Sequence, residues 1–234
     1  MPVIVIASSK GGVGKSTTAI ALSAELAIQC KDSGIDVTLI DADQNQHSAG
    51  WALLAGRPSN LKLIQNSNEE SILDDIEDAD AVSGFVIVDL EGTANMSVAS
   101  AISRATLVII MCQGSILDAK EAVKTVKMIN RQERVLGRSI AYSVLFTRTS
   151  AAIRSRTYSN IVSELDNLGI DIFKSTLIER DAYKALPSFG GPINELDKSQ
   201  VPGVEKATKD IRDLTKELKF KLNVLLNGGN ANGK

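Results

Sequence analysis

Short runs of aliphatic and β-branched residues alternate along the chain with longer segments in which apolar residues recur every three or four positions. The first kind of segment is typical of buried strands and the second of amphipathic helices. The pattern predicts strands at 2–8, 36–42, 61–65, 84–90, 105–112, 139–147 and 171–176. It predicts helices at 15–31, 46–56, 69–80, 94–104, 116–135, 151–168, 180–186 and 202–226. This alternation indicates an α/β fold, a doubly wound and mostly parallel sheet with helices on both faces.

The length and composition of the chain fit one α/β domain of ordinary globular type. It has 234 residues, of which 44% are hydrophobic and 23% are charged, and this length is enough for a sizeable core. No glycine- or proline-rich linker interrupts residues 1–226, which we expect to form a single domain. The glycine- and asparagine-rich residues 227–234 are expected to be a flexible tail.

The segment Ser-Lys-Gly-Gly-Val-Gly-Lys-Ser-Thr, at 9–17, separates the first predicted strand from the first predicted helix. A strand, a glycine-rich loop and a helix in this order are the setting of a phosphate-binding P-loop. Lys15 would contact the β- and γ-phosphates, and the Ser16 hydroxyl would bind Mg²⁺. Phosphate oxygens would be surrounded by the backbone N–H groups of Gly11, Gly12, Val13 and Gly14. The segment therefore predicts binding of a nucleoside triphosphate.

Carboxylates follow two further predicted strands. Asp41 and Asp43 end the strand at 36–42, and Asp89 ends the strand at 84–90. In a parallel sheet, the carboxyl ends of the strands meet at one edge, which is also where the P-loop lies. We therefore expect these three carboxylates to lie beside the bound phosphates.

Charge and cysteine content restrict the classes of partner and compartment. The net charge of −2 gives no overall basic field, so any nucleic-acid binding requires a local patch. Cys30 and Cys112 lie in apolar segments and are expected to be core residues in a reducing compartment. No signal sequence precedes the first strand, and no apolar run approaches membrane-spanning length, which favours a cytoplasmic protein.

The residues from Lys10 to Thr17 resemble the deviant Walker A box of the ParA/MinD family of ATPases, in which a second lysine precedes the glycines. The resemblance implies ATP and Mg²⁺ as cofactors and an ATP-bound homodimer. It implies that Lys10 reaches the phosphates held by the partner subunit, as an arginine finger does. It also places Thr17 at the α-phosphate and Thr147 on the adenine side of the site.

The same resemblance assigns roles to the carboxylates. Asp89 is similar to the Walker B aspartate, which holds Mg²⁺ directly or through water. Asp41 would support the Mg²⁺ site, and Asp43 would orient the attacking water, so that Lys10, Lys15 and Asp43 form the catalytic set. The chain departs from the family pattern because Asn45 follows Gln44 and no proline follows Asp43. These departures concern hydrolysis and partner coupling rather than nucleotide binding.

The family resemblance also implies a cellular role. It implies slow hydrolysis stimulated by a partner protein of the centromere-binding or relaxosome type. It further implies nucleoid association through non-specific DNA binding, with a plasmid or DNA-transfer complex as cargo. The segment containing Arg148, Arg154 and Arg156 has no acidic residue and is the predicted DNA-binding site. Residues 89–93 and 146–154 resemble the ParA-type ATPases of conjugative and virulence DNA transfer in particular.

Two other functions fit the same chemistry. A membrane-cycling regulator like MinD would need a basic amphipathic helix at the C-terminus. Here the apolar stripe Ile211, Leu214, Leu218, Leu222 and Leu225 is followed by a glycine–asparagine tail, so we expect the stripe to dock on the sheet and expect no stable membrane association. An ATP switch that recruits a protein cargo without binding DNA is the second alternative. The iron–sulfur reductases of the superfamily need exposed cysteines in loops, which this sequence lacks.

Overall fold

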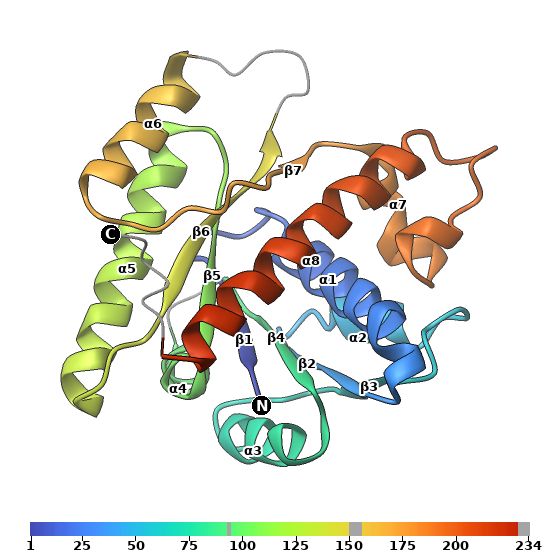
Figure 1. Ribbon diagram of the computed structural model, residues 1–234, viewed down its shortest axis with the longest axis horizontal. Helices are drawn as coiled ribbons and strands as arrows, with labels where there is room; N and C mark the ends of the chain where they lie inside the picture. The colour runs from blue at the N-terminus through green and yellow to red at the C-terminus, as the bar shows by residue number, and fades with distance from the viewer. Residues whose placement is uncertain (93–94, 150–155, 229–234) are drawn as a thin grey trace.

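A computed structural model describes residues 1–92, 95–149 and 156–228 of the protein (Figure 1). Within these ranges seven strands form one sheet, in the order β3-β2-β4-β1-β5-β6-β7, and every pair is parallel. The strands are β1 (Val3–Ala7), β2 (Val37–Ala42), β3 (Leu61–Ile64), β4 (Phe85–Leu90), β5 (Leu107–Cys112), β6 (Tyr142–Thr149) and β7 (Leu177–Ile178). The predicted α/β architecture is confirmed.

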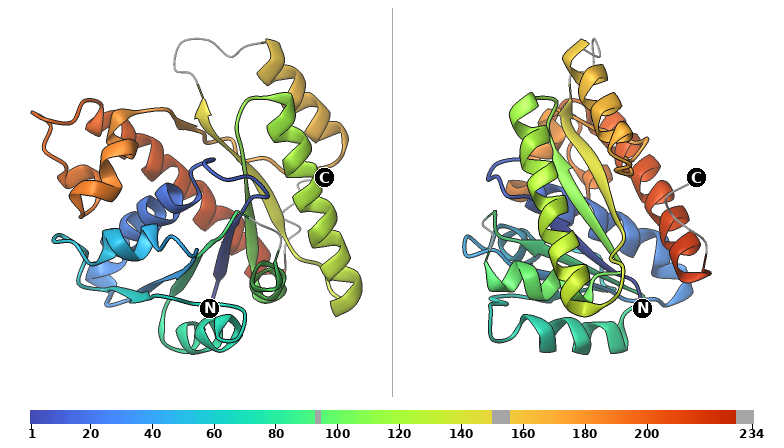
Figure 2. Two further views of the ribbon diagram at one scale, coloured as in Figure 1. Left: turned by 180° about the vertical axis from the view of Figure 1, so that it is seen from behind. Right: turned by 90° about the vertical axis from the view of Figure 1, so that its left-hand side faces the viewer.

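Helices cover both faces of the sheet (Figures 1 and 2). One face carries α1 (Lys15–Cys30), α2 (His47–Ala52), α7 (Asp181–Phe189) and α8 (Val204–Leu226). The other carries α3 (Ile72–Val82), α4 (Met96–Arg104), α5 (Ile116–Leu136) and α6 (Arg156–Asn167). Short 3₁₀ turns lie at Lys31–Ser33 and Ile193–Glu195. Among the described residues, no helix combines the length and apolarity needed to cross a membrane.

The core consists of two layers, one on each side of the sheet. Successive residues of a strand point to opposite faces, so Ile4 and Ile6 of β1 enter the layer beneath α1 and α8. Val3 and Val5 enter the layer beneath α3 to α6. All residues of β1, β2 and β5 are buried. Burial on both sides explains why these strands are continuous apolar runs rather than alternating ones.

The apolar stripe of α8 docks on the protein's own core, as the sequence predicts. Ile211, Leu214, Leu218 and Leu222 are at most 2% exposed and pack in the layer shared with α1. The stripe is therefore occupied by intramolecular packing. A helix that binds a membrane would instead have to present these side chains to lipid.

The strand predicted at 171–176 is wrong in its position. Regular pairing with β6 begins only at β7, and Ile172 forms a single isolated bridge to Val144. The backbone N–H groups of Lys174 and Ser175 donate instead to the Glu217 carboxylate of α8, at 2.7 and 2.8 Å. A side chain from the last helix thus takes the donors that a strand would have used, which no local sequence pattern reveals.

A close contact joins α2 to the turn after α7. The indole N–H of Trp51, a side chain 1% exposed, donates to the Gly191 carbonyl oxygen at 3.0 Å. Gly190 has a φ of 72°, and a Cβ there would lie 2.6 Å from the Ala55 carbonyl oxygen. The turn therefore needs glycine both for its left-handed conformation and for the approach of two backbones.

We predict that Gly190→Ala lowers the free energy of unfolding by about 2–4 kcal/mol, because strain and a backbone clash act together. Gly137→Ala is the comparison, since Gly137 has the ordinary left-handed helical conformation, with φ 67° and ψ 19°, and nothing lies within 4 Å of its added Cβ. That control should lose only about 1 kcal/mol. Urea unfolding followed by circular dichroism measures both values, and equal losses would contradict the importance of the α2–α7 contact.

Candidate nucleotide site

The predicted P-loop lies at the carboxyl edge of the sheet, between the end of β1 and the start of α1. Gly14 caps α1 with a φ of 95°, and its carbonyl oxygen accepts the first helical hydrogen bond from Thr18. Lys15 is only 6% exposed, whereas Gly11 and Gly12 are exposed. The loop therefore presents glycine backbone outward and holds its lysine inside, above an N-terminus that favours anions.

Sheet register brings two of the predicted carboxylates side by side. Asp41 of β2 lies directly opposite Asp89 of β4, and Asp89 pairs in turn with Ile6 of β1. Both carboxylates are fully buried. The pKa of Asp89 is raised to about 7, chiefly by burial and in smaller part by the nearby Asp41 charge, against the opposing effects of the Ser48 and Ser16 hydroxyls and of Lys15.

One of the two carboxylate oxygens of Asp89 has no hydrogen-bond partner among the described residues. The Ser48 hydroxyl donates to Oδ2 at 2.6 Å, whereas Oδ1 is buried and accepts no hydrogen bond from any described residue. A buried acceptor without a partner is costly, so a cation or its water ligands would satisfy it. No three His, Cys, Asp or Glu side chains form a metal cluster within the described residues. The site fits Mg²⁺, which uses one or two carboxylates together with substrate phosphates and waters.

Asp41 and Asp43 organise the segment that follows β2. Asp41 accepts the backbone N–H of Asp43 at 3.0 Å through Oδ1 and that of Ala49 at 2.7 Å through Oδ2. Asp43 Oδ1 accepts both the backbone and side-chain N–H groups of Asn45, each at 2.9 Å. Asp43 also lines a pocket with Gln44 and Glu91. Asp41 therefore fixes the backbone, and Asp43, itself only 8% exposed, borders the pocket.

Lys10 is held within its own chain. Its Nζ lies 2.6 Å from Oδ1 of Asp118, a carboxylate 3% exposed in the first turn of α5. The neighbouring Ser9 hydroxyl donates to Glu121 Oε2 at 2.7 Å. The sequence analysis missed both acids and also Ser48. The spacing Ser115-x-x-Asp118 signals a helix N-cap, which the structure has, but it does not reveal the contact with Lys10.

The turn after β4 approaches the P-loop closely. A Cβ added to Gly92 would lie 3.2 Å from the Gly11 backbone nitrogen and 3.3 Å from Lys15 Nζ. Any larger residue would press on both groups. Position 92 therefore favours glycine, because the P-loop backbone and the Lys15 side chain occupy the space that a Cβ would enter.

A second pocket opens behind the P-loop, lined among others by Val13, Thr17, Thr147 and Tyr183. The Thr147 hydroxyl donates to the Val13 carbonyl oxygen at 2.8 Å, so Thr147 supports the loop as well as forming the wall. The register of β6 against β7 shifts between Thr147 and Thr149. This irregularity places the intervening Arg148, with φ of 51°, at the pocket rim.

The three predicted DNA-binding arginines do not form one described cluster. Arg148 is exposed beside the pocket, and Arg156 is exposed at the start of α6. Arg154 lies outside the described residues. The structure thus places Arg148 at the pocket behind the P-loop.

Comparison with known proteins finds similarity over most of the chain. The family model for the VirC1 protein matches residues 1–226. Protein ParA of Rhizobium radiobacter is 42% identical over 200 residues, which cover 86% of this chain and 88% of that protein. The structure of apo McdA from Cyanothece has a TM-score of 0.72 at 19% identity, covering 93% of this chain and 99% of that one. A putative plasmid partition protein of Borrelia burgdorferi bound to AMPPNP has a TM-score of 0.68 at 19% identity, covering 94% and 99%. The two structural similarities show the fold.

We predict that Asp89→Asn raises the free energy of unfolding of the ligand-free protein by about 1–3 kcal/mol at pH 8, because it removes a buried charge without a full set of partners. Asp41→Asn is the matched control at the neighbouring strand. Its amide would accept only one of two backbone N–H groups, so this variant should lose stability by about 1–3 kcal/mol. Thermal unfolding without Mg²⁺ or nucleotide tests the opposite signs, and a loss for Asp89→Asn would contradict the unsatisfied-carboxylate interpretation.

Proposed function

Because the chain belongs to the VirC1 family and is a ParA/MinD-type ATPase, we propose that it is a Mg²⁺-dependent ATPase that dimerises on ATP and binds DNA without sequence preference. Its cargo is a plasmid or a DNA-transfer complex, and a partner protein stimulates its hydrolysis. The observation that carries the nucleotide part is the buried, unpaired Oδ1 of Asp89 beside Ser16 and Lys15. Similarity to a ParA protein and to a plasmid partition fold supports the cargo.

The chain's own groups then divide the work of hydrolysis. Lys15 and the backbone N–H groups of residues 11–16 would bind the phosphates, and Ser16 and Asp89 would hold the metal. When bound, Mg²⁺ would neutralise charge that develops on the phosphates. Asp41 fixes the segment that carries Asp43, and Asp43 orients the attacking water.

Lys10 supplies the step that requires a second subunit. Its ion pair with Asp118 holds it on its own chain, so the pair must open before Lys10 reaches a partner's phosphates. Because Lys10 pairs with Asp118 in the monomer, it is not available to the phosphates, and hydrolysis without a dimer should be slow. This contact gives a physical reason for an ATPase that is active only in the assembled state.

We predict that Lys10→Ala retains ATP binding but loses the ATP-induced dimer, and that single-turnover hydrolysis falls at least about 100-fold, since a charge supplied across a dimer contributes on that scale or above it. Light scattering after gel filtration and a single-turnover assay measure the two effects. Lys62→Ala is the control, because Lys62 pairs with Asp36 at the far edge of the sheet. Unchanged turnover in Lys10→Ala would contradict the assigned role.

The DNA part of the proposal is tested by fluorescence anisotropy with a labelled duplex of mixed sequence. Binding should require ATP, should be weak with ADP or without nucleotide, and should fall steeply across a salt series. Absence of binding in all three states would contradict the DNA part and would favour an ATP switch that recruits a protein cargo.

A further inference from the structure

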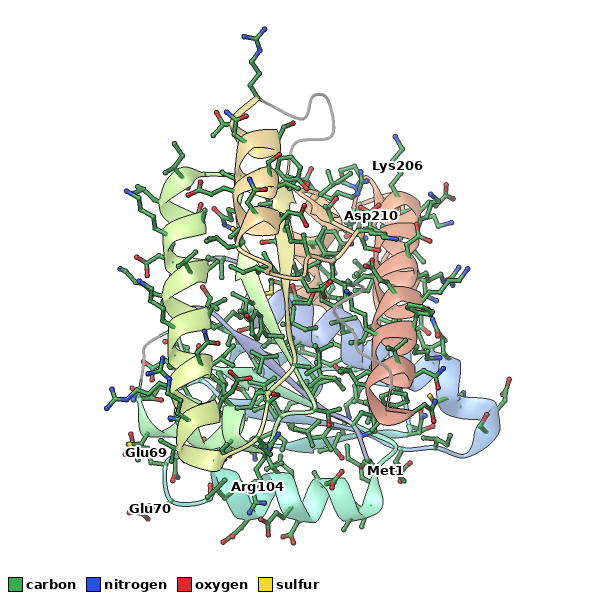
Figure 3. All side chains as sticks on the ribbon, turned by 60° about the vertical axis from the view of Figure 1, so that its left-hand side comes forward. Met1, Glu69, Glu70, Arg104, Lys206 and Asp210 are labelled. Atoms are coloured by element: carbon green, nitrogen blue, oxygen red, sulfur yellow. The ribbon has the colours of Figure 1, made fainter. Side chains whose placement is uncertain are left out.

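A continuous basic face runs along α5. Between positions 120 and 134 of this helix, the exposed residues are Lys120, Lys124, Lys127, Arg131 and Arg134, and every other residue is buried or partly buried. Spacings of four, three, four and three residues place them on one side of the helix. In Figure 3, side chains tipped with nitrogen project from the outer side of α5. The face extends about 21 Å along the helix axis.

The charges of this face are largely uncompensated. Lys124 pairs with Glu121 at 2.6 Å, but Lys120, Lys127, Arg131 and Arg134 form no ion pair with any residue that the structure describes. The acids of α5 are turned elsewhere, since Asp118 holds Lys10 and Glu133 accepts the Ile140 backbone N–H. Like charges at these spacings repel one another, so the face is set up to receive an anionic ligand.

Helix α8 shows what an ordinary solvated basic helix looks like in the same chain. Acidic and basic residues are mixed along its exposed side, with Glu205 beside Lys206 and Arg212 beside Asp213. Three of its six basic residues have an acidic partner, since Lys209 pairs with Asp213, Arg212 with Glu25 and Lys221 with Asp171. The two helices have similar numbers of basic residues. The face of α5 is exclusively basic because of where its lysines and arginines lie on the helix, not because it has more of them.

We infer that this α5 face is the principal DNA-contacting surface of the protein and binds the phosphate backbone of duplex DNA. The inference rests on the proposed function and names the site through which it acts. A straight row of cations about 21 Å long matches the rise of about six base pairs. Lysine and arginine contacts to phosphates supply affinity without reading sequence. An anionic membrane fits less well, because the apolar residues between 120 and 134, such as Val126 and Ile129, are buried or partly buried. The exposed apolar residues of α5, which are Ile116, Leu117, Val135 and Leu136, lie beyond the two ends of the basic face.

The test compares two double variants with the same substitutions at the same spacing. Lys120→Gln/Lys127→Gln removes two charges from α5, and Lys209→Gln/Lys216→Gln removes two exposed charges, also seven residues apart, from α8. Anisotropy with a labelled 24-base-pair duplex and ATP, over a salt series, gives affinity and salt slope. We expect the α5 variant to bind about 10- to 100-fold more weakly at 100 mM salt and to lose about 2 from the slope of log K against log salt. The α8 variant should match the unchanged protein, and Lys120→Arg/Lys127→Arg should retain binding.

The outcomes separate this inference from the proposed function. If the unchanged protein fails to bind the duplex with ATP, both are overturned. If it binds and the α5 variant keeps its affinity and salt slope, or if both glutamine variants lose equally, only the α5 assignment is overturned. A flotation assay with vesicles of phosphatidylglycerol and phosphatidylcholine tests the membrane alternative. If the α5 variant loses vesicle binding but keeps its DNA binding, the α5 face is a membrane surface and the DNA assignment is overturned. Thermal unfolding of each variant checks that the fold is intact.

Discussion

The parallel register between β2 and β4 is the constraint on which the site depends. It places Asp41 directly opposite Asp89 inside the protein, where two like charges are costly to hold. The protein offsets part of this cost differently on each strand. Asp41 receives two backbone N–H groups, whereas Asp89 receives hydroxyls and keeps an oxygen unpaired. In the proposed function a cation would remove the remaining cost, so that metal binding and relief of strain in the folded state would be the same event.

Sequence patterns were sufficient for the features that depend on neighbours in the chain. Runs buried on both sides marked β1, β2, β4 and β5, and the glycine-rich loop with its following helix marked the P-loop. The edge carboxylates followed from the rule that parallel strands end together. These predictions succeed because a strand's burial and a loop's composition are local properties.

Other features depend on residues that are distant in sequence and left no pattern. Asp118 meets Lys10, and Glu217 takes the N–H groups that a strand at 171–176 would have used. Each contact joins a loop to a helix that is distant in sequence and lies beside the loop only in the folded protein. Only the three-dimensional structure therefore reveals the contact. Helix α5 is the clearest case, because the buried Asp118 in its first turn holds Lys10 of the P-loop while the exposed side of the helix between 120 and 134 is basic. A ligand on that side and a change at Lys10 would therefore act on one rigid element.

The Glu217 contact also bears on how molecules of this protein avoid one another. The last strand of the sheet, β7, is two residues long, and the chain before it has its N–H groups of Lys174 and Ser175 occupied by a carboxylate. Those donors are not offered to a strand from a neighbouring molecule. A long, unpaired edge is a template for aggregation. A single glutamate on α8 thus closes part of this edge of the sheet to growth.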